Sequence, residues 1–174
     1  EANFTLFDLA DVYSNGQAEE LFGQALKEIP GMQEHILIAT KCGVRKAGLP
    51  DKDSPYRYDS SRAHIIESCE QSLKRLGVDT IDLYQIHRPD YLMEPEEVAA
   101  AFETLRQSGK AREFGVSNFS PAQFDLLRMA YPMPLVSNQV EISLCHLDAL
   151  HNGTVEHCRK HALTPLAWSP LAKG

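Results

Sequence analysis

Four polar residues of the sequence have side chains and positions that suit catalysis. Asp8 and Tyr13 lie in the segment FDLADVY, Lys41 ends the apolar run ILIATK, and His87 ends LYQIH. Each lies at, or just after, the C-terminal end of a β-type segment. In a parallel α/β barrel these strand ends converge on one face, where active sites are built. An acid, a phenol, an ammonium group and an imidazole gathered there can transfer a proton to or from a carbonyl oxygen.

The chemistry of this set follows from the residue types. A tyrosine hydroxyl alone is a poor proton donor at neutral pH, but a nearby ammonium group such as that of Lys41 favours the phenolate. Asp8 can hold the lysine in its charged form, and a neutral His87 can hydrogen-bond the substrate oxygen. Such a set suits carbonyl reduction, in which the oxygen gains a proton as the carbon gains a hydride. Because no side chain supplies hydride, a nicotinamide cofactor is implied.

Each of these residues also has an ordinary structural interpretation. An aspartate is commonly a cap, and a single tyrosine or histidine at a strand end is commonly a satisfied structural residue. Lys41 is harder to explain in this way, because an unpaired ammonium group is costly to bury. The combination of the four in successive strand–helix units is therefore what predicts a catalytic site.

The segments that must position these residues alternate between strand and helix patterns. The β-type runs span residues 4–7, 36–40, 81–86, 114–116, 135–140 and 165–168, and the helical patterns span residues 18–29, 61–76, 95–107, 121–131 and 154–162. We expect Asp59 or Ser60 to cap the second helix, and Ser120, followed by Pro121, to cap the fourth. The alternation predicts βαβ units and a parallel sheet, hence an α/β fold.

Alternation alone does not distinguish an open doubly wound sheet from a closed barrel. Successive side chains of a strand point to opposite faces, so Lys41 shares a face with Ala39, and His87 shares one with Gln85 and Leu83. If that face is the interior of a barrel, each strand brings a polar residue to the mouth. By the same alternation Cys42 faces the outer helices, as a buried and inert thiol.

Composition narrows the class of protein. The 174 residues are enough for one domain, 1–174, and the net charge of −7 without a Lys/Arg cluster argues against nucleic acid or an anionic membrane as partner. No apolar stretch approaches the ~20 residues that span a bilayer. The four cysteines show no close pairing pattern, which favours reduced thiols and a cytoplasmic location.

Six segments, taken in order, carry a resemblance to a known family. FDLADVYSNGQAEELFG, ATKCG, SCEQSLKRLGVDTIDLYQIHRPD, GKAREFGVSNF, NQVEISL and PLAWSPLAKG resemble a bacterial-type aldo-keto reductase. The resemblance implies a (β/α)8 TIM barrel, NADP(H) as cofactor and a small-molecule carbonyl substrate. It makes Tyr13 the general acid in reduction, Lys41 the group that activates it, Asp8 the partner of Lys41, and His87 the donor that orients the substrate.

The resemblance also implies a set of cofactor contacts. Ser117, Asn118 and Gln139 match residues that hydrogen-bond the nicotinamide carboxamide. Trp168 matches the aromatic residue that stacks on the nicotinamide, a position where some branches have tyrosine. Ser169 and Leu171 would offer backbone or hydroxyl groups to the pyrophosphate.

About six βα units are present, whereas a closed barrel needs eight strands. The resemblance places the first strand before Glu1 and the eighth after Gly174, together with the basic residues that bind the 2′-phosphate. We therefore expect a partial segment, incomplete at both ends, whose two bare sheet edges would favour association. The oligomeric state, the substrate and the choice between NADP and NAD are left open.

Other functions remain compatible with these residues. A non-catalytic NADP(H)-binding regulatory subunit of the same fold is the main alternative. A Schiff-base lyase that uses Lys41 is a second, which Tyr13 and His87 disfavour. His157 and His161 have the spacing of metal ligands on a helix, but no HExxH pattern or cysteine pair accompanies them, so no metal site is predicted.

Overall fold

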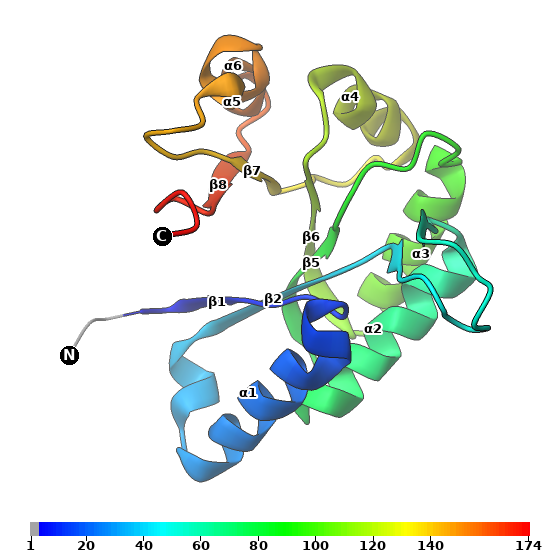
Figure 1. The fold of residues 1–174 in the computed structure, drawn as a ribbon, viewed down its shortest axis with the longest axis vertical. Coiled ribbons are helices and arrows are strands. Elements are labelled where there is room, and N and C mark those ends of the chain that lie inside the picture. The colour runs from blue at the N-terminus through cyan, green and yellow to red at the C-terminus, as the bar shows by residue number, and fades with distance from the viewer. Residues whose placement is uncertain (1–3) are drawn as a thin grey trace.

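The computed structural model describes residues 4–174, and these form an α/β fold around one curled parallel sheet (Figure 1). The strands are β1 (Leu6–Asp8), β2 (Leu37–Cys42), β5 (Ile81–Ile86), β6 (Ala111–Ser117), β7 (Ser137–Glu141) and β8 (Thr164–Trp168). They pair in the order β1-β2-β5-β6-β7-β8, every neighbour parallel. The sheet is therefore part of a barrel wall rather than a doubly wound sheet, in which the strand order reverses.

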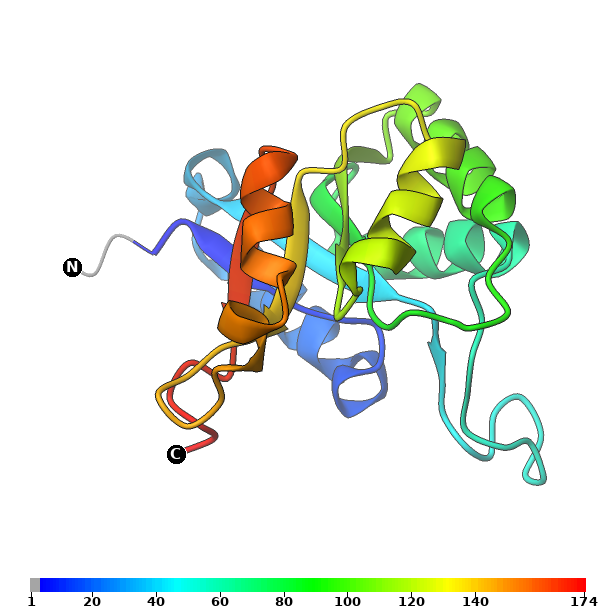
Figure 2. The same cartoon turned by 90° about the horizontal axis from the view of Figure 1, so that it is seen from above.

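Helices connect successive strands and cover the outer side of the curl (Figures 1 and 2). They are α1 (Gln17–Glu28), α2 (Arg62–Leu76), α3 (Pro95–Gln107), α4 (Pro121–Ala130), α5 (Asp148–His151) and α6 (Thr154–Lys160). Every predicted strand and helix is confirmed, with bounds that differ by a few residues. None of the helices in residues 4–174 is long and apolar enough to cross a bilayer.

Five small elements are not predicted, one of which is the four-residue helix α5. Two are the 3-10 helices η1 (Tyr13–Gly16) and η2 (Met32–His35), and two are the strands β3 (Val44–Arg45) and β4 (Arg57–Tyr58), which pair antiparallel. The segment that contains β3 and β4 follows the C-terminal end of β2 and projects away from the rest of the fold (Figure 2). Its strands have two residues each, too few for side-chain alternation to be read from the sequence.

The helix caps agree with the prediction at one helix and differ at another. At α4, Ser120 and Gln123 form a reciprocal capping box, with Pro121 as the first helical residue. At α2 the expected cap, Asp59 or Ser60, is wrong: the hydroxyl of Ser61 accepts from the His64 N–H. The carboxylate of Asp59 instead accepts from the backbone N–H and the hydroxyl of Ser61, so it orients the cap from two residues away.

The hydrophobic core lies between the sheet and the outer helices. Phe102 of α3 stacks on Phe114 of β6 at 4.4 Å between ring centroids, and both rings meet Tyr131 edge-on. Cys42 is fully buried in this core, as predicted, and burial raises the pKa of its thiol well above the ordinary value. The outward-facing residues of the strands are thus fixed by packing, which orients their inward-facing neighbours.

Strand register places the polar inward-facing residues side by side. Asp8 is opposite Ala39, and Lys41 is opposite Gln85. The side-chain alternation expected from the sequence is confirmed in this register, because the Lys41 and Gln85 side chains are both buried on the concave side of the sheet. The polar residues therefore meet at the C-terminal edge of β1, β2 and β5.

Candidate active site

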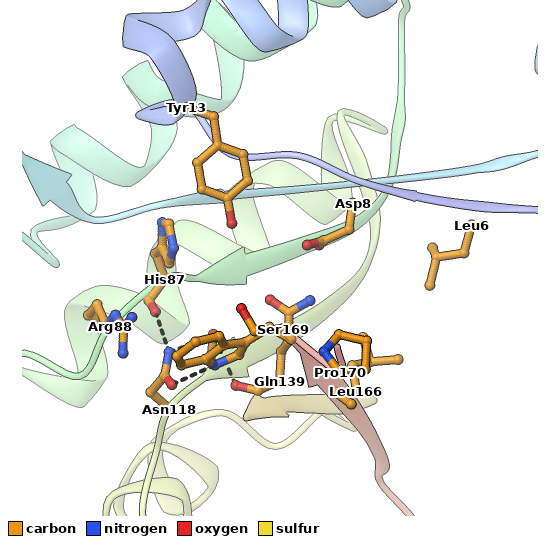
Figure 3. A pocket seen from close by; sticks show the side chains of 13 residues that line it. Leu6, Asp8, Tyr13, His87, Arg88, Asn118, Gln139, Leu166, Ser169 and Pro170 are labelled. Atoms are coloured by element: carbon orange, nitrogen blue, oxygen red, sulfur yellow. Dashed lines mark hydrogen bonds between the residues drawn. The ribbon is translucent and has the colours of Figure 1, made fainter. Parts of the chain in front are cut away.

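A cavity of about 570 Å³ opens at the C-terminal ends of the strands (Figure 3). It is lined by Leu6, Asp8, Tyr13, His87, Arg88, Ser117, Asn118, Gln139, Leu166, Ala167, Trp168, Ser169 and Pro170. The lining thus includes three of the four predicted catalytic residues and five of the six predicted cofactor contacts. The fourth catalytic candidate, Lys41, lies beneath the lining and is fully buried.

The Lys41 ammonium group joins the other residues at the base of the cavity. Its Nζ lies 2.7 Å from Asp8 Oδ2, 2.7 Å from the backbone oxygen of Leu9 and 3.3 Å from the Tyr13 hydroxyl. An ammonium group has three donors, and here three acceptors receive them. The carboxylate and the carbonyl offset the cost of burying the charge. The third N–H of the ammonium group points to the phenol oxygen, so the positive charge lies directly beside the Tyr13 hydroxyl.

Tyr13 is presented by a tight turn. It begins η1, where Ser14 and Asn15 take left-handed backbone angles, and Gly16 follows with φ +88°. The positive φ of Gly16 favours glycine, and a Cβ there would also lie 2.9 Å from the Cδ of Arg75 and displace that side chain. The turn leaves the Tyr13 ring 39% exposed, with its hydroxyl toward the cavity and Asp8 (Figure 3).

A buried ion pair supports this turn from behind. Glu19 of α1 is fully buried and accepts hydrogen bonds from Thr40 Oγ1 of β2 at 2.5 Å and from Arg75 Nε of α2 at 2.7 Å. Thr40 immediately precedes Lys41, and Arg75 packs over Gly16. One carboxylate therefore links the strand that carries the ammonium group to the turn that carries the phenol.

His87 faces Tyr13 across the cavity. The two rings lie edge to face, 5.7 Å between centroids. Burial, aided by the positive charges of Lys41 and Arg88, lowers the pKa of His87 to about 4. The imidazole is therefore neutral at physiological pH, with one N–H to donate and one nitrogen to accept.

The residues predicted to hold the carboxamide form one hydrogen-bonded set. Ser117 Oγ donates to the backbone oxygen of Gln139 at 2.9 Å, and Asn118 Nδ2 donates to Ser117 Oγ at 2.8 Å and to the His87 carbonyl at 3.3 Å. Trp168 Nε1 donates to Asn118 Oδ1 at 2.9 Å. An indole beside amide groups in a cavity of this size fits a flat ring that bears an amide, which is the chemistry of nicotinamide.

The predicted site and the observed cavity lining differ at two residues. Leu171 is 84% exposed and lies outside the cavity lining, so the structure does not bring its side chain to the site. Arg88 lines the cavity but was not predicted. The available signal was its position directly after His87, two residues beyond a strand that ends at the barrel mouth.

His157 and His161, the pair for which the sequence predicts no metal site, belong to a cluster on the outer surface. His157 Nε2 lies 2.9 Å from Asp125 Oδ1, and His161 Nε2 lies 3.4 Å from the same atom. Arg128 Nη1 lies 2.7 Å from His161 Nδ1, which makes this nitrogen the acceptor and leaves the proton on Nε2. The guanidinium of Arg128 thus satisfies His161 Nδ1, whereas the buried His161 Nε2 has no hydrogen-bond partner in the described chain, and the cluster joins α4 to α6.

Comparison with known proteins identifies the family. The model of the aldo/keto reductase family matches residues 1–174, and the chain belongs to this family. Among solved structures, the glycerol dehydrogenase AKR11B4 from Gluconobacter oxydans superposes with a TM-score of 0.86 at 38% identity, over 98% of this chain and 50% of that one. An aldo/keto reductase from Klebsiella pneumoniae in complex with NADP and acetate has a TM-score of 0.78 at 28% identity, over 97% of this chain and 54% of that one.

Curated relatives are similar along nearly the whole chain. The oxidoreductase YdhF of Escherichia coli is 47% identical over 170 residues, which are 98% of this chain and 57% of the relative. A 6-dehydroglucose reductase of Agrobacterium fabrum is 43% identical over 98% of this chain and 58% of its own length. The chain therefore spans a little over half the length of these relatives.

Proposed function

We propose that the protein containing this chain reduces an aldehyde or ketone to an alcohol, with NADPH as hydride donor and Tyr13 as general acid. The observation that carries the proposal is the buried Lys41 ammonium group, which is held by Asp8 and lies 3.3 Å from the Tyr13 hydroxyl. A lysine this deeply buried is hard to explain by stability alone, because replacing such pairs by apolar residues is often neutral or stabilising.

The roles of the residues follow from their contacts. When bound, the nicotinamide supplies the hydride to the carbonyl carbon. The Tyr13 hydroxyl gives its proton to the carbonyl oxygen, and the Lys41 ammonium group stabilises the phenolate that remains. The neutral His87 donates an N–H to the same oxygen and orients the carbonyl. Asp8 keeps Lys41 charged and in place throughout.

The cofactor would be held by the opposite side of the cavity. Trp168 would stack on the nicotinamide ring. Polar groups of Ser117, Asn118 and Gln139 would hydrogen-bond the carboxamide, and Ser169 would contact the pyrophosphate. The hydrogen bond from Trp168 to Asn118 fixes the plane of the indole. The indole would thus give the nicotinamide a fixed stacking surface, and the carboxamide contacts would choose which face of the ring meets the substrate.

We further propose that residues 1–174 belong to a single barrel domain. The consecutive parallel pairing of the six strands supports this, as does the barrel fold of the structural relatives. Cytoplasmic location and the absence of a nucleic-acid partner stay predictions.

Turnover tests the proposal directly. The intact protein is incubated with NADPH and a panel of aldehydes and ketones, and both NADPH oxidation and alcohol formation are measured. We expect stoichiometric conversion of at least one substrate class. Tight NADPH binding without any turnover would instead assign the protein as a cofactor-binding regulatory subunit.

A further inference from the structure

Arg88 occupies a position between two cavities. It follows His87 at the end of β5 and lines the 570 Å³ cavity that contains Tyr13. It also lines a neighbouring cavity of about 510 Å³ over α5 and the N-terminal end of α4, and Asn118 and Trp168 are common to both. The guanidinium group therefore lies between the candidate active site and this neighbouring cavity.

The charge of Arg88 has no counter-ion within residues 4–174. Three other arginines are paired with carboxylates: Arg45 with Asp59, Arg75 with Glu19 and Arg112 with Asp82. The remaining arginines also lack a carboxylate partner in the described chain, but among the described residues Arg88 is the one arginine that lines the candidate active-site cavity. Lys173, the other cation near Trp168, is already paired with Glu141. No hydrogen bond to the Arg88 guanidinium is formed by the described residues either, which leaves its five donors free for a ligand.

Arg88 is nevertheless held in position. Its Cζ lies 5.5 Å from the centre of the Trp168 ring, a cation–π contact that orders the side chain without using its donors. Figure 3 shows its guanidinium beside His87 and Asn118. An ordered, half-buried guanidinium with free donors matches a carboxylate or a phosphate, which it can bind through two parallel hydrogen bonds.

We propose that Arg88 binds the anionic group of the substrate, so that the protein acts on short carbonyl compounds that bear a carboxylate or a phosphate. This inference rests on the proposed function, because it assumes that the carbonyl oxygen lies between Tyr13 and His87. Arg88 adjoins His87 in the chain, so the anionic group would be only a few bonds from the reacting carbon. A neutral aldehyde would enter the same cavity without this contact.

Substrate pairs that differ in charge test the proposal. Glyceraldehyde is compared with glyceraldehyde 3-phosphate, and butanal with succinic semialdehyde, in the wild type and in Arg88→Met. We expect the KM of the anionic member of each pair to rise about 10- to 100-fold in the variant, as loss of a charged hydrogen bond implies. The KM of the neutral members should rise much less, so that the ratio of the two KM values within each pair changes about 10- to 100-fold.

Two further variants control the measurement. Arg88→Lys should restore part of the preference, because it keeps the charge but loses the planar fork. Arg159→Met removes an exposed arginine on α6 and should leave every parameter unchanged. Equal KM increases for neutral and anionic substrates would overturn the proposal, since they would mean that Arg88 only maintains the shape of the cavity.

Binding without turnover separates this inference from the proposed function. Trp168 is the only tryptophan of residues 1–174, so the change in fluorescence that depends on Trp168, checked against Trp168→Phe, can follow titration with glycerol 3-phosphate or glycerol. Preferential binding of the phosphate, lost in Arg88→Met, would support the anion subsite even if no carbonyl were reduced. Lack of such preference, or loss of NADPH affinity in place of substrate affinity, would overturn it; in the latter case Arg88 would bind a cofactor phosphate.

Discussion

The indole N–H of Trp168 donates to Asn118 Oδ1 at 2.9 Å, and the amide nitrogen of the same asparagine donates to the carbonyl of His87. The aromatic residue of the last strand is thereby tied to the end of β5. The residue proposed to stack on the cofactor and the residue proposed to orient the substrate are thus positioned through one side chain.

Trp168→Ala should weaken cofactor binding more than it slows the chemical step. Stacking contacts are worth roughly 0.5–1.5 kcal/mol beyond area burial, so affinity for NADPH should fall several-fold to tenfold. Isothermal titration of the intact protein measures this directly. Trp168→Phe keeps an aromatic face but loses the hydrogen bond to Asn118. Its affinity for NADPH should lie between those of the wild type and Trp168→Ala. An unchanged dissociation constant in Trp168→Ala would make this residue part of the core only.

Tyr13→Phe should abolish most carbonyl reduction and leave cofactor affinity nearly unchanged. The variant removes only the hydroxyl that lies 3.3 Å from Lys41 Nζ. Loss of a general acid commonly costs on the order of 10²–10⁴ in rate. Tyr56→Phe, at an exposed tyrosine outside the cavity lining, is the matched control. If Tyr13→Phe kept more than half of the wild-type kcat, Tyr13 would not be the acid.

Lys41→Met should slow both directions and shift the pH dependence of alcohol oxidation to more alkaline pH. Without the ammonium group nothing stabilises the phenolate that must accept the proton. The pH–rate profiles of the variant and the wild type are compared in the oxidation direction, together with their circular dichroism spectra. Superimposable profiles would remove Lys41 from the mechanism.

Asp11→Asn should stabilise the protein above neutral pH. Burial, reinforced by the negative charge of Glu19, raises the pKa of Asp11 to about 7, and Oδ1 has no hydrogen-bond partner in the described chain. The folded state holds the proton more tightly than the unfolded one, so stability is lost as pH rises from about 4 to about 7. Asparagine removes this cost, and we expect a gain on the order of 1–3 kcal/mol at pH 8 and a much smaller one at pH 5.

Urea unfolding at the two pH values measures the effect. Asp79→Asn, at an exposed aspartate, should change neither curve. A gain for Asp11→Asn that is the same at pH 5 and pH 8 would show that the effect is not ionisation of Asp11.

His87→Gln should reduce the loss of stability on acidification. The lowered pKa of His87, about 4, means that the folded imidazole resists protonation that the unfolded chain accepts near pH 6.5. Stability from this group is therefore present above pH 6.5 and is lost as pH falls from about 6.5 to about 4. Melting temperatures at pH 7.5 and pH 5 should differ less in the variant than in wild type. The exposed His151→Gln serves as control, and an unchanged difference in His87→Gln would contradict the prediction.

Much of the site could be predicted because strand periodicity determines it. Apolar runs that end in Lys41 and His87 require those side chains to meet at the mouth of a parallel sheet, and the register of β2 against β5 confirms it. The α2 cap was misplaced because Asp59 is bound to both Arg45 and Ser61, which no local pattern reveals. Arg88 is not predicted because its place directly after His87 does not show which way its side chain points, and only the folded structure shows that it lines the cavity.

The Glu19 carboxylate, bound to Thr40 on one side and Arg75 on the other, has a consequence for how the site works. It joins β2, α1 and α2 into a single rigid unit, and a fully buried charge of this kind is not free to change partners. In the proposed mechanism, this link would hold the turn that carries Tyr13 and the strand that carries Lys41 at the observed 3.3 Å separation of their polar atoms. Such preorganisation means that a ligand's binding energy is not consumed in assembling the phenol–ammonium pair and can act on the substrate itself.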